Sequence, residues 1–414
     1  MQQDIGDNGA HPPRRVGVAV VGLGGAVATT AIAGVELLRL GLAGTEGLPL
    51  AHGPIAQHAA GLAAYDQLVF GGWDLCGDDL ATAAEKHGVL EAAQLAAAGP
   101  WLARHAPWPA VGNTAFCRKV DGCNQVMART HRERVAQIVA DLGGFAVEQA
   151  LDGMVMVNLA STERAGEPTQ AVLASPEAFE AGLDQSDPAI GPALLYAYAA
   201  ITAGVPYANF TPSLAADAPA LVALSERLGV PITGKDGKTG QTMVKTVLAP
   251  GLRSRALRVE GWFSSNLLGN RDGLALDDPG SLAAKVATKG SVLDDLLGYA
   301  VDDHVVTIAY YRPRGDNKEA WDTIDLVGFL GQRMQLKLNF LCRDSILAAP
   351  LVLEIARLLD LAARRGERGP QAQLGLFFKQ PMAAAGRPVE HALHRQEEAL
   401  RAWLAAGDRA QVAQ

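Results

Sequence analysis

Residues 16–41 form an apolar run, a cluster of glycines and a stretch of helical composition, in that order. The run VGVAVV, residues 16–21, is apolar throughout, which is typical of a strand buried on both faces of a parallel sheet. The turn GLGG then supplies Gly22, Gly24 and Gly25. Gly22 can form a tight turn, and Gly24 lets the backbone approach a pyrophosphate where a helix starts. The segment therefore predicts the first unit of a dinucleotide-binding fold.

This glycine turn is incomplete as a motif. Val27 stands where the third glycine of G-x-G-x-x-G is expected, so a strand–helix turn without a ligand is the alternative. An acidic residue is also not evident about 20 residues further on, where one would contact the ribose. Asp74, in GGWD after the apolar residues 68–70, is our candidate for that role, and the alternative is a turn or capping residue.

Strand and helix signals continue to alternate over the first part of the chain, which predicts a doubly wound α/β sheet. Further strands are expected at residues 68–70 and 153–160, at the start of 205–212 before a turn, and at the start of 230–237 before a loop. Helices are expected at 128–142, 192–204 and 218–228. The pattern then changes, because residues 256–263, 305–311 and 334–340 show strand signals with partial alternation. We expect these to form a second sheet with one solvated or oligomeric face, with two short helices between its first two strands.

The last part of the chain is expected to be helical from residue 344 to 359 and again near its end, with a flexible loop at 365–369. We expect a Rossmann-like domain, 14–242 completed by 344–408, and a second α/β domain, 243–343. Residues 1–13 are expected to be a flexible arm.

Composition excludes several classes of protein. The hydrophobic fraction of 49% excludes a disordered chain, and the formal net charge of −8 argues against a nucleic-acid partner. The four cysteines include no C-x-x-C pair, which predicts free thiols in a reducing compartment. We see no apolar signal core, and residues 16–21 are too short to span a membrane. The expectation is a soluble cytoplasmic protein.

The segment GKDGKTGQT, residues 234–242, is rich in small and polar residues and leads into a helix. Its backbone N–H groups could form an anion-binding nest. Thr239, Gly240, Gln241 and Thr242 stand where that helix begins, an arrangement suited to a phosphate monoester. A capped surface loop without a ligand is the alternative.

The segment SSNLLGNRDG, residues 264–273, follows an expected strand. Asn266, Asn270 and Asp272 would converge on one polar loop, where such side chains can bind sugar hydroxyls. Asp272 could also bind a divalent ion, although no metal-ligand spacing supports this strongly. The alternative is a turn built from Asn, Asp and Gly.

Four lysines are candidates for proton transfer or for stabilising negative charge. Lys285 and Lys289, in KVATKG, are spaced i and i+4 and share one helix face. In a cleft, their mutual repulsion and desolvation would lower a lysine pKa towards neutrality. Lys318, in RGDNK, and Lys379, in LFFKQP, are isolated. Solvated surface lysines are the alternative for all four.

Six short strings occur together in one order: GKDGKTGQTMVKT, LGNRDG, KVATKGSV, GDNK, DSILAAP and FFKQP. With NFTPS before them, they make the chain resemble the myo-inositol-1-phosphate synthase family, and more closely its shorter archaeal-type members. The resemblance implies an NAD-dependent enzyme, with a divalent metal as an additional candidate, and a homotetramer. It implies conversion of D-glucose 6-phosphate to 1L-myo-inositol 1-phosphate by oxidation at carbon 5, enolisation, intramolecular aldol addition and re-reduction.

The resemblance also implies residue roles. The NAD site would comprise Gly22, Gly24, Gly25, Ala26, Val27, Asp74, Ala160, Thr162, Asp344 and Ser345. The substrate phosphate would contact Thr239, Gly240, Gln241, Thr242 and Lys289, and the sugar hydroxyls Asn266, Asn270 and Asp272. Lys285 would relay a proton at the carbon 5 oxygen, and Lys318 and Lys379 would stabilise the enolate and the aldol oxyanion. Asp236 matches an acidic position that orients a catalytic lysine.

Some positions depart from the family pattern. Ala26 and Val27 replace a pair of asparagines, Arg271 stands where a neutral residue is usual, and Lys235 replaces an acidic or amide residue. The two extra cations motivate one alternative, a paralogue that cyclises another sugar phosphate, such as fructose 6-phosphate, to a five-membered carbocycle. A non-catalytic NAD-binding protein and a simple NAD dehydrogenase are further alternatives.

Overall fold

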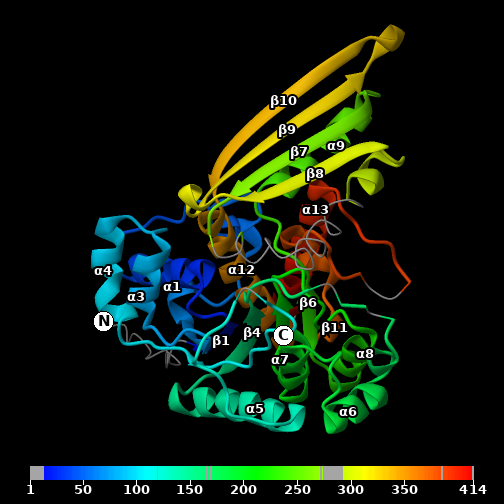
Figure 1. The fold of residues 1–414 in the computed structure, drawn as a ribbon. Coiled ribbons are helices and arrows are strands. Elements are labelled where there is room, and N and C mark those ends of the chain that lie inside the picture. Colours follow the sequence, from blue (N-terminus) through cyan, green and yellow to red (C-terminus); the bar gives the residue numbers. More distant parts are fainter. Residues whose placement is uncertain are drawn as a thin grey trace, which may run out of the picture.

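The structure is a computed structural model. It describes residues 14–412, except Lys119, Ala165, Pro168, residues 271–272 and 274–291, and residues 384–385; the side chains of 407–412 are also left undescribed. In this part of the chain, seven strands form one sheet in the order β11-β6-β5-β4-β1-β2-β3, and every neighbouring pair is parallel (Figure 1). The strands are β1 (Val16–Val21), β2 (Leu68–Asp74), β3 (Trp108–Pro109), β4 (Gly153–Asn158), β5 (Tyr207–Asn209), β6 (Pro231–Gly234) and β11 (Gly369–Pro370). The expected α/β class and parallel sheet are confirmed.

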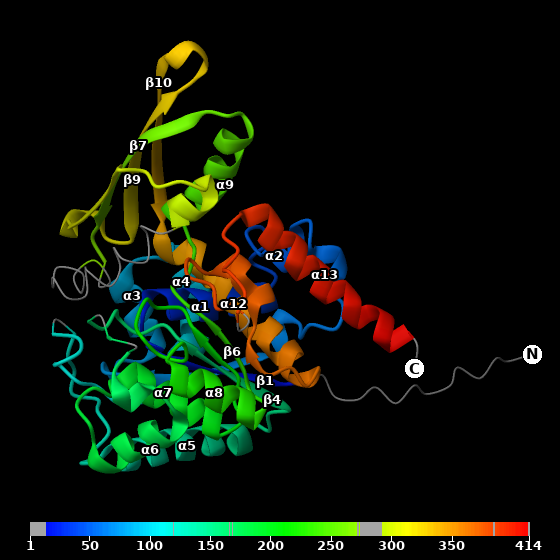
Figure 2. The same cartoon turned by 90° about the vertical axis from the view of Figure 1, so that its right-hand side faces the viewer.

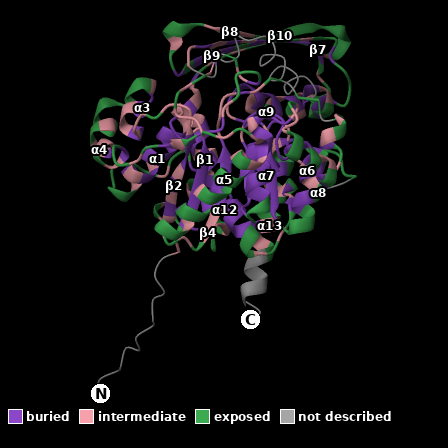
Figure 3. Cartoon of the chain, turned by 60° about the horizontal axis from the view of Figure 1, so that its bottom comes forward, coloured by how far each residue is buried: buried purple, intermediate pink, exposed green. Residues whose placement is uncertain are grey.

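Helices cover both faces of this sheet (Figure 2). One layer holds α1 (Ala26–Arg39), α2 (Pro49–His52), α3 (Leu80–His87), α4 (Ala92–Leu102), α12 (Asp344–Arg364) and α13 (Leu393–Val412). The other holds α5 (His131–Glu148), α6 (Pro176–Gln185), α7 (Pro192–Thr202) and α8 (Pro219–Leu228). Successive residues of a strand face opposite sides, so Val18 and Val20 pack in the first core and Ala19 and Val21 in the second. Figure 3 shows the buried residues gathered between these layers.

A second sheet of four strands stands beyond the first, in the order β10-β9-β7-β8 (Figure 1). Its strands are β7 (Arg258–Leu268), β8 (Asp303–Tyr310), β9 (Asn317–Val327) and β10 (Arg333–Arg343). β7 and β8 are parallel, and β9 runs antiparallel to β7 and β10. Helix α9 (Gln241–Ser254) and the helical residues 292–297 pack on one face through a separate apolar core.

Several expected elements differ in extent or were missed. The helix expected at 128–142 is α5, which starts at His131 because Thr130 caps it and Glu133 completes a capping box. The loop expected at 365–369 ends earlier, since Gly369 begins β11 and pairs with Pro231. The sequence analysis missed α3, α4, α6 and the whole of β9. No helix among the described residues is both long enough and apolar enough to cross a membrane.

Candidate functional site

The glycine turn after β1 lies against the end of β4. Gly22 has a left-handed φ of +89°, and a Cβ there would come within 3.1 Å of the Ala160 backbone. Its N–H donates to the Trp73 carbonyl at the end of β2. Gly25 is the N-cap of α1, and it makes no side-chain hydrogen bond to the first backbone N–H groups of the helix. The first N–H groups of α1 therefore point into the space beyond the sheet, where an anion can accept from them.

Asp74 lies at the end of β2, next to the glycine turn. Its Oδ2 accepts from the Gly24 backbone N–H at 3.0 Å, and its Oδ1 accepts from the Cys76 N–H at 2.9 Å. A carboxylate oxygen can accept more than one hydrogen bond, so both contacts are compatible with a ribose hydroxyl. The carboxylate is 50 residues from Gly24 in sequence because residues 40–67 intervene between α1 and β2.

One cavity of about 590 Å³ is lined both by residues of this turn and by two of the candidate lysines. Its wall includes fourteen of the predicted site residues: Gly22, Gly25, Ala26, Val27, Asp74, Ala160, Thr162, Asp236, Thr239, Asn270, Lys318, Asp344, Ser345 and Lys379. Gly24 lines a smaller cavity of about 240 Å³, which shares Ala26 and Asn270 with the first. The wall also contains Phe210, Thr211 and Pro212, to which the sequence analysis assigned no role although NFTPS was part of the resemblance.

Lys379 and Asp236 form a buried ion pair, with Lys379 Nζ 2.7 Å from Asp236 Oδ1. Their side chains are 7% and 4% exposed. Asp236 follows β6, and Lys379 follows the 3₁₀ helix η6 (Ala372–Phe377). The Lys379 N–H also donates to the Asp236 carbonyl at 2.7 Å, so the two segments are joined through the backbone as well. The expected acidic partner of a site lysine therefore lies beside Lys379.

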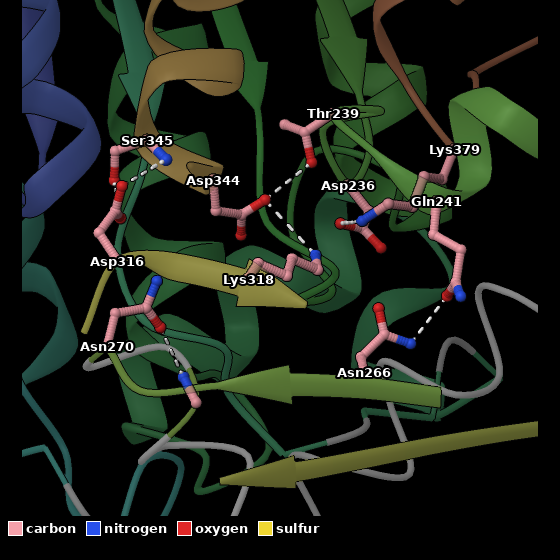
Figure 4. A network of polar contacts seen from close by, with 11 residues as sticks. Asp236, Thr239, Gln241, Asn266, Asn270, Asp316, Lys318, Asp344, Ser345 and Lys379 are labelled. Carbon is pink, nitrogen blue, oxygen red and sulfur yellow. Dashed lines mark hydrogen bonds and ion pairs between the residues drawn. The ribbon is translucent and has the colours of Figure 1, made fainter. Parts of the chain in front are cut away.

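Asp344 joins the two sheets. It is the first residue of α12, where the helix dipole favours a negative charge. Its Oδ1 accepts from Thr239 Oγ1 at 3.1 Å and lies 3.4 Å from Lys318 Nζ, as Figure 4 shows. Beside it, Ser345 Oγ donates to Asp316 Oδ1 at 2.6 Å. Burial raises the pKa of the Asp316 carboxyl, and the hydrogen bond from Ser345 opposes this change.

The predicted phosphate segment lies at the start of α9. Gly240 is the N-cap of α9 and makes no side-chain hydrogen bond to the first turn. The backbone N–H groups at the start of α9 therefore suit an anion. The Gln241 side chain turns into the protein, where Nε2 donates to Asp322 and Oε1 accepts from Asn266 Nδ2 at 2.7 Å. Four predicted substrate residues are buried and are not part of the cavity wall: Gly240, Gln241, Thr242 and Asn266.

Two buried lysines were missed, of which Lys238 lies within this segment and Lys245 follows it on α9. Lys238 Nζ donates to Gln396 Oε1 at 2.5 Å, and burial lowers the pKa of Lys238 to about 7. Lys245 Nζ lies 2.7 Å from His304 Nε2, and burial lowers the pKa of Lys245 to about 8. Lys245 is four residues after Gln241, so helical periodicity could have placed it on the inward face of α9.

The remaining predicted residues fall outside the described chain: Lys285, Lys289 and Asp272, together with Arg271. The Asn270 side chain accepts a hydrogen bond from the Gly273 N–H at 3.0 Å. Within the described ranges, no group of three or more His, Cys, Asp or Glu residues could hold a metal ion.

Comparisons with known proteins agree with this geometry. Residues 16–405 match the model of an NAD-binding family described as myo-inositol-1-phosphate synthase. The chain is 39% identical to inositol-3-phosphate synthase 1 of Bacteroides thetaiotaomicron, over 92% of this chain and 93% of the relative. The crystal structure of inositol-3-phosphate synthase from Caenorhabditis elegans superposes with a TM-score of 0.88 at 26% identity, covering 95% of this chain and 86% of that one. A myo-inositol-1-phosphate synthase-related protein from Thermotoga maritima gives a TM-score of 0.76 at 25% identity, covering 95% and 99%. The chain belongs to the myo-inositol-1-phosphate synthase family.

Proposed function

We propose that the protein cyclises D-glucose 6-phosphate to 1L-myo-inositol 1-phosphate with no net oxidation or reduction. One observation carries the proposal. The same cavity of about 590 Å³ is lined by the glycine turn and Asp74 and also by Lys318, Asp344 and Lys379. An oxidation and a carbon–carbon bond formation on one sugar need a hydride site and cationic side chains within reach of the same substrate.

The residues at the first end suit NAD. The close approach of Gly22 to Ala160 leaves no room for a side chain, and the start of α1 offers backbone N–H groups to a pyrophosphate. Asp74 at the end of β2 suits the adenosine ribose. We place Thr162, Asp344 and Ser345 along the rest of the dinucleotide. When bound, NAD⁺ would supply a hydride acceptor for carbon 5 of the sugar and return that hydride at the end of the cycle.

The residues at the second end suit the sugar phosphate. We assign the phosphate to the N-terminus of α9, with Thr239 and Lys289. The Lys318 and Lys379 ammonium groups would stabilise the oxyanions of the enolate and of the aldol step. Asp236 would orient Lys379, since it accepts from Nζ at 2.7 Å. Lys285 would take up and return the proton on the carbon 5 oxygen.

Carbon-13-labelled glucose 6-phosphate with a catalytic amount of NAD⁺ tests the proposal. We expect carbon and phosphorus NMR to show inositol 1-phosphate, with no accumulation of NADH by absorbance. Net NADH would instead indicate a simple dehydrogenase. A parallel tube with fructose 6-phosphate tests the paralogue. Turnover of that sugar alone would replace our proposal, and no turnover of either would favour a non-catalytic protein. Magnesium or zinc in matched tubes tests the metal.

We also propose that residues 14–242 with 344–408 form one domain, and that 243–343 form a second that makes the contacts of a homotetramer. The face of the second sheet that lies away from α9 supports this, because it exposes large apolar side chains. Phe263, Val305 and Trp321 are 46%, 43% and 43% exposed and lie on three adjacent strands. Such a face is typical of a symmetric contact between copies. Light scattering after gel filtration should give four times the chain mass of 43.3 kDa.

A further inference from the structure

A buried carboxylate on β9 begins a chain of hydrogen bonds that ends beside the proposed substrate site. Asp322 is 2% exposed. Its Oδ1 accepts from Trp262 Nε1 at 2.7 Å and from Ser264 Oγ at 2.6 Å, and its Oδ2 accepts from Gln241 Nε2 at 3.0 Å. Gln241 Oε1 in turn accepts from Asn266 Nδ2 at 2.7 Å (Figure 4).

The direction of this chain follows from the charge at its start. An ionised carboxylate can only accept hydrogen bonds, so Gln241 must present its NH₂ group to Asp322. The other end of that amide is then an oxygen, so Asn266 must present its NH₂ group to Gln241. Each amide could rotate in isolation, because its two ends are almost the same shape. The single negative charge of Asp322 fixes both.

Asn266 consequently turns its oxygen the other way. Oδ1 is fully buried and has no hydrogen-bond donor within the described part of the chain. In Figure 4 this oxygen points to the side where Lys318, Asp236 and Lys379 lie. A second contact favours the same orientation, since Asn266 Nδ2 lies 3.4 Å from the Thr307 carbonyl oxygen. A buried acceptor without a donor is costly, and a sugar hydroxyl that entered from the neighbouring cavity would supply that donor.

We propose that Asp322 is a positioning residue that keeps Asn266 a hydrogen-bond acceptor for one hydroxyl of the sugar phosphate. The inference rests on the proposed function for its substrate. Lys245 lies in the same core, where burial lowers its pKa and the negative charge of Asp322 opposes that change. Asp322 acts through Gln241 and Asn266 and does not itself touch the sugar.

Asp322→Asn should reverse the chain. Trp262 can only donate, so Asn at 322 would keep its oxygen there and turn its NH₂ group to Gln241. Gln241 would have to offer its oxygen to position 322 and its NH₂ group to Asn266. The Asn266 NH₂ group would then either face the NH₂ group of Gln241, or the Asn266 amide would rotate and present its NH₂ group to the substrate. In both cases the acceptor for the hydroxyl is lost.

Two compensating changes should restore it. In Asp322→Asn/Asn266→Asp, the carboxylate at 266 accepts from the reversed Gln241 and still presents an oxygen to the substrate. In Asp322→Asn/Gln241→Glu, the carboxylate at 241 accepts from both neighbours, and Asn266 keeps its original orientation. Asn266→Asp alone should fail, because the oxygen of Gln241 would face a carboxylate. A residue that merely supports the fold would not produce this pattern of rescue.

The experiment measures kcat and KM for glucose 6-phosphate, calorimetric binding of the sugar phosphate, NAD⁺ affinity and the melting temperature of each variant. We expect Asp322→Asn and Asn266→Asp to lower kcat/KM about 10- to 100-fold with NAD⁺ affinity unchanged, and each double variant to recover at least about tenfold. Asp325→Asn is the matched control, because Asp325 is on the same strand, is exposed, and contacts Gln335.

Failure of the inference differs from failure of the proposed function. If the wild type does not convert glucose 6-phosphate but binds it or fructose 6-phosphate, calorimetry on the same variants decides the inference, while the proposed function is lost. The inference is overturned if folded Asp322→Asn binds and turns over substrate like the wild type. It is equally overturned if both double variants fold and their kcat/KM and sugar phosphate binding stay as low as those of the single variants. Should Asp322→Asn alone not fold, the comparison of Asn266→Asp with the double variant carries the same two outcomes.

Discussion

Replacing Lys238 by methionine should stabilise the protein, and more at acid than at alkaline pH. Lys238 is 4% exposed, and its Nζ donates to Gln396 Oε1. Burial disfavours the charged form and lowers the pKa of Lys238 from 10.5 to about 7. Methionine has a similar length and keeps the apolar contacts of the stem without the ammonium group.

The sign and size follow from linkage between proton binding and folding. Because the pKa is lower in the folded state, the unfolded chain binds more protons between pH 7 and pH 10.5, and stability rises with pH across this window. With these two pKa values, the buried Lys238 amine destabilises the folded state by about 5 kcal/mol at pH 6 and by about 2 kcal/mol at pH 9. Loss of the hydrogen bond to Gln396 offsets about 1 kcal/mol at both pH values.

Urea unfolding of wild type and Lys238→Met at pH 6 and pH 9 measures the effect. The stability gap, the unfolding free energy of Lys238→Met minus that of wild type, should be about 2–3 kcal/mol larger at pH 6 than at pH 9. His391 acts in the same direction, because burial lowers the pKa of its imidazole and the nearby charge of Lys238 lowers it further. Lys337→Met is the control, since Lys337 is exposed on β10. A gap that is equal at both pH values would refute the reasoning.

Three further changes test other parts of the structure. Gly22→Ala should weaken NAD⁺ binding at least about tenfold by calorimetry, because φ is +89° and the added Cβ meets backbone at 3.1 Å; Gly34→Ala, with open space around its Cβ, should bind normally. Arg357→Met should cost about 3–5 kcal/mol in urea unfolding, because Glu354 is fully buried and loses its ion pair at 2.6 Å; a loss below about 1 kcal/mol would contradict this. Lys379→Ala should reduce inositol 1-phosphate formation at least about 100-fold with NAD⁺ still bound, and near-normal turnover would remove Lys379 from the mechanism.

The parallel sheet could be predicted from sequence because its strands are short and apolar on both faces. β1 is buried at every position, so its signal does not depend on distant partners. β9 shows the opposite case. Its inward residues are Lys318, Ala320, Asp322, Ile324 and Leu326, and the buried lysine and carboxylate interrupt the apolar alternation by which a strand is recognised. These same polar residues are the ones to which we assign roles in the proposed site, and local departures from a sequence pattern are expected at such positions.

The site was only partly predictable for a related reason. The resemblance to the family placed Asp236, Lys318, Lys379 and Asp344 among the candidates, but it did not say which lysine Asp236 or Asp344 contacts. Those pairings depend on where separate segments meet in space. Lys238 was missed altogether, because its partner is the neutral amide of Gln396, 158 residues away.

The contacts around Asp344 explain why the two sheets must keep their relative position. The chain leaves the first sheet through residues 235–240 and enters α9, and it returns where β10 ends at Arg343 and α12 begins at Asp344. Thr239 lies at the exit, Asp344 at the return, and Lys318 on the strand beside β10. All three meet through one carboxylate oxygen, at 3.1 Å and 3.4 Å. A shift of the second sheet by about one ångström would break these hydrogen-bond distances, and with them the alignment of the cationic side chains with the proposed hydride site. The contacts between copies that we propose on the outer face of the second sheet would therefore act directly on the geometry of the proposed reaction.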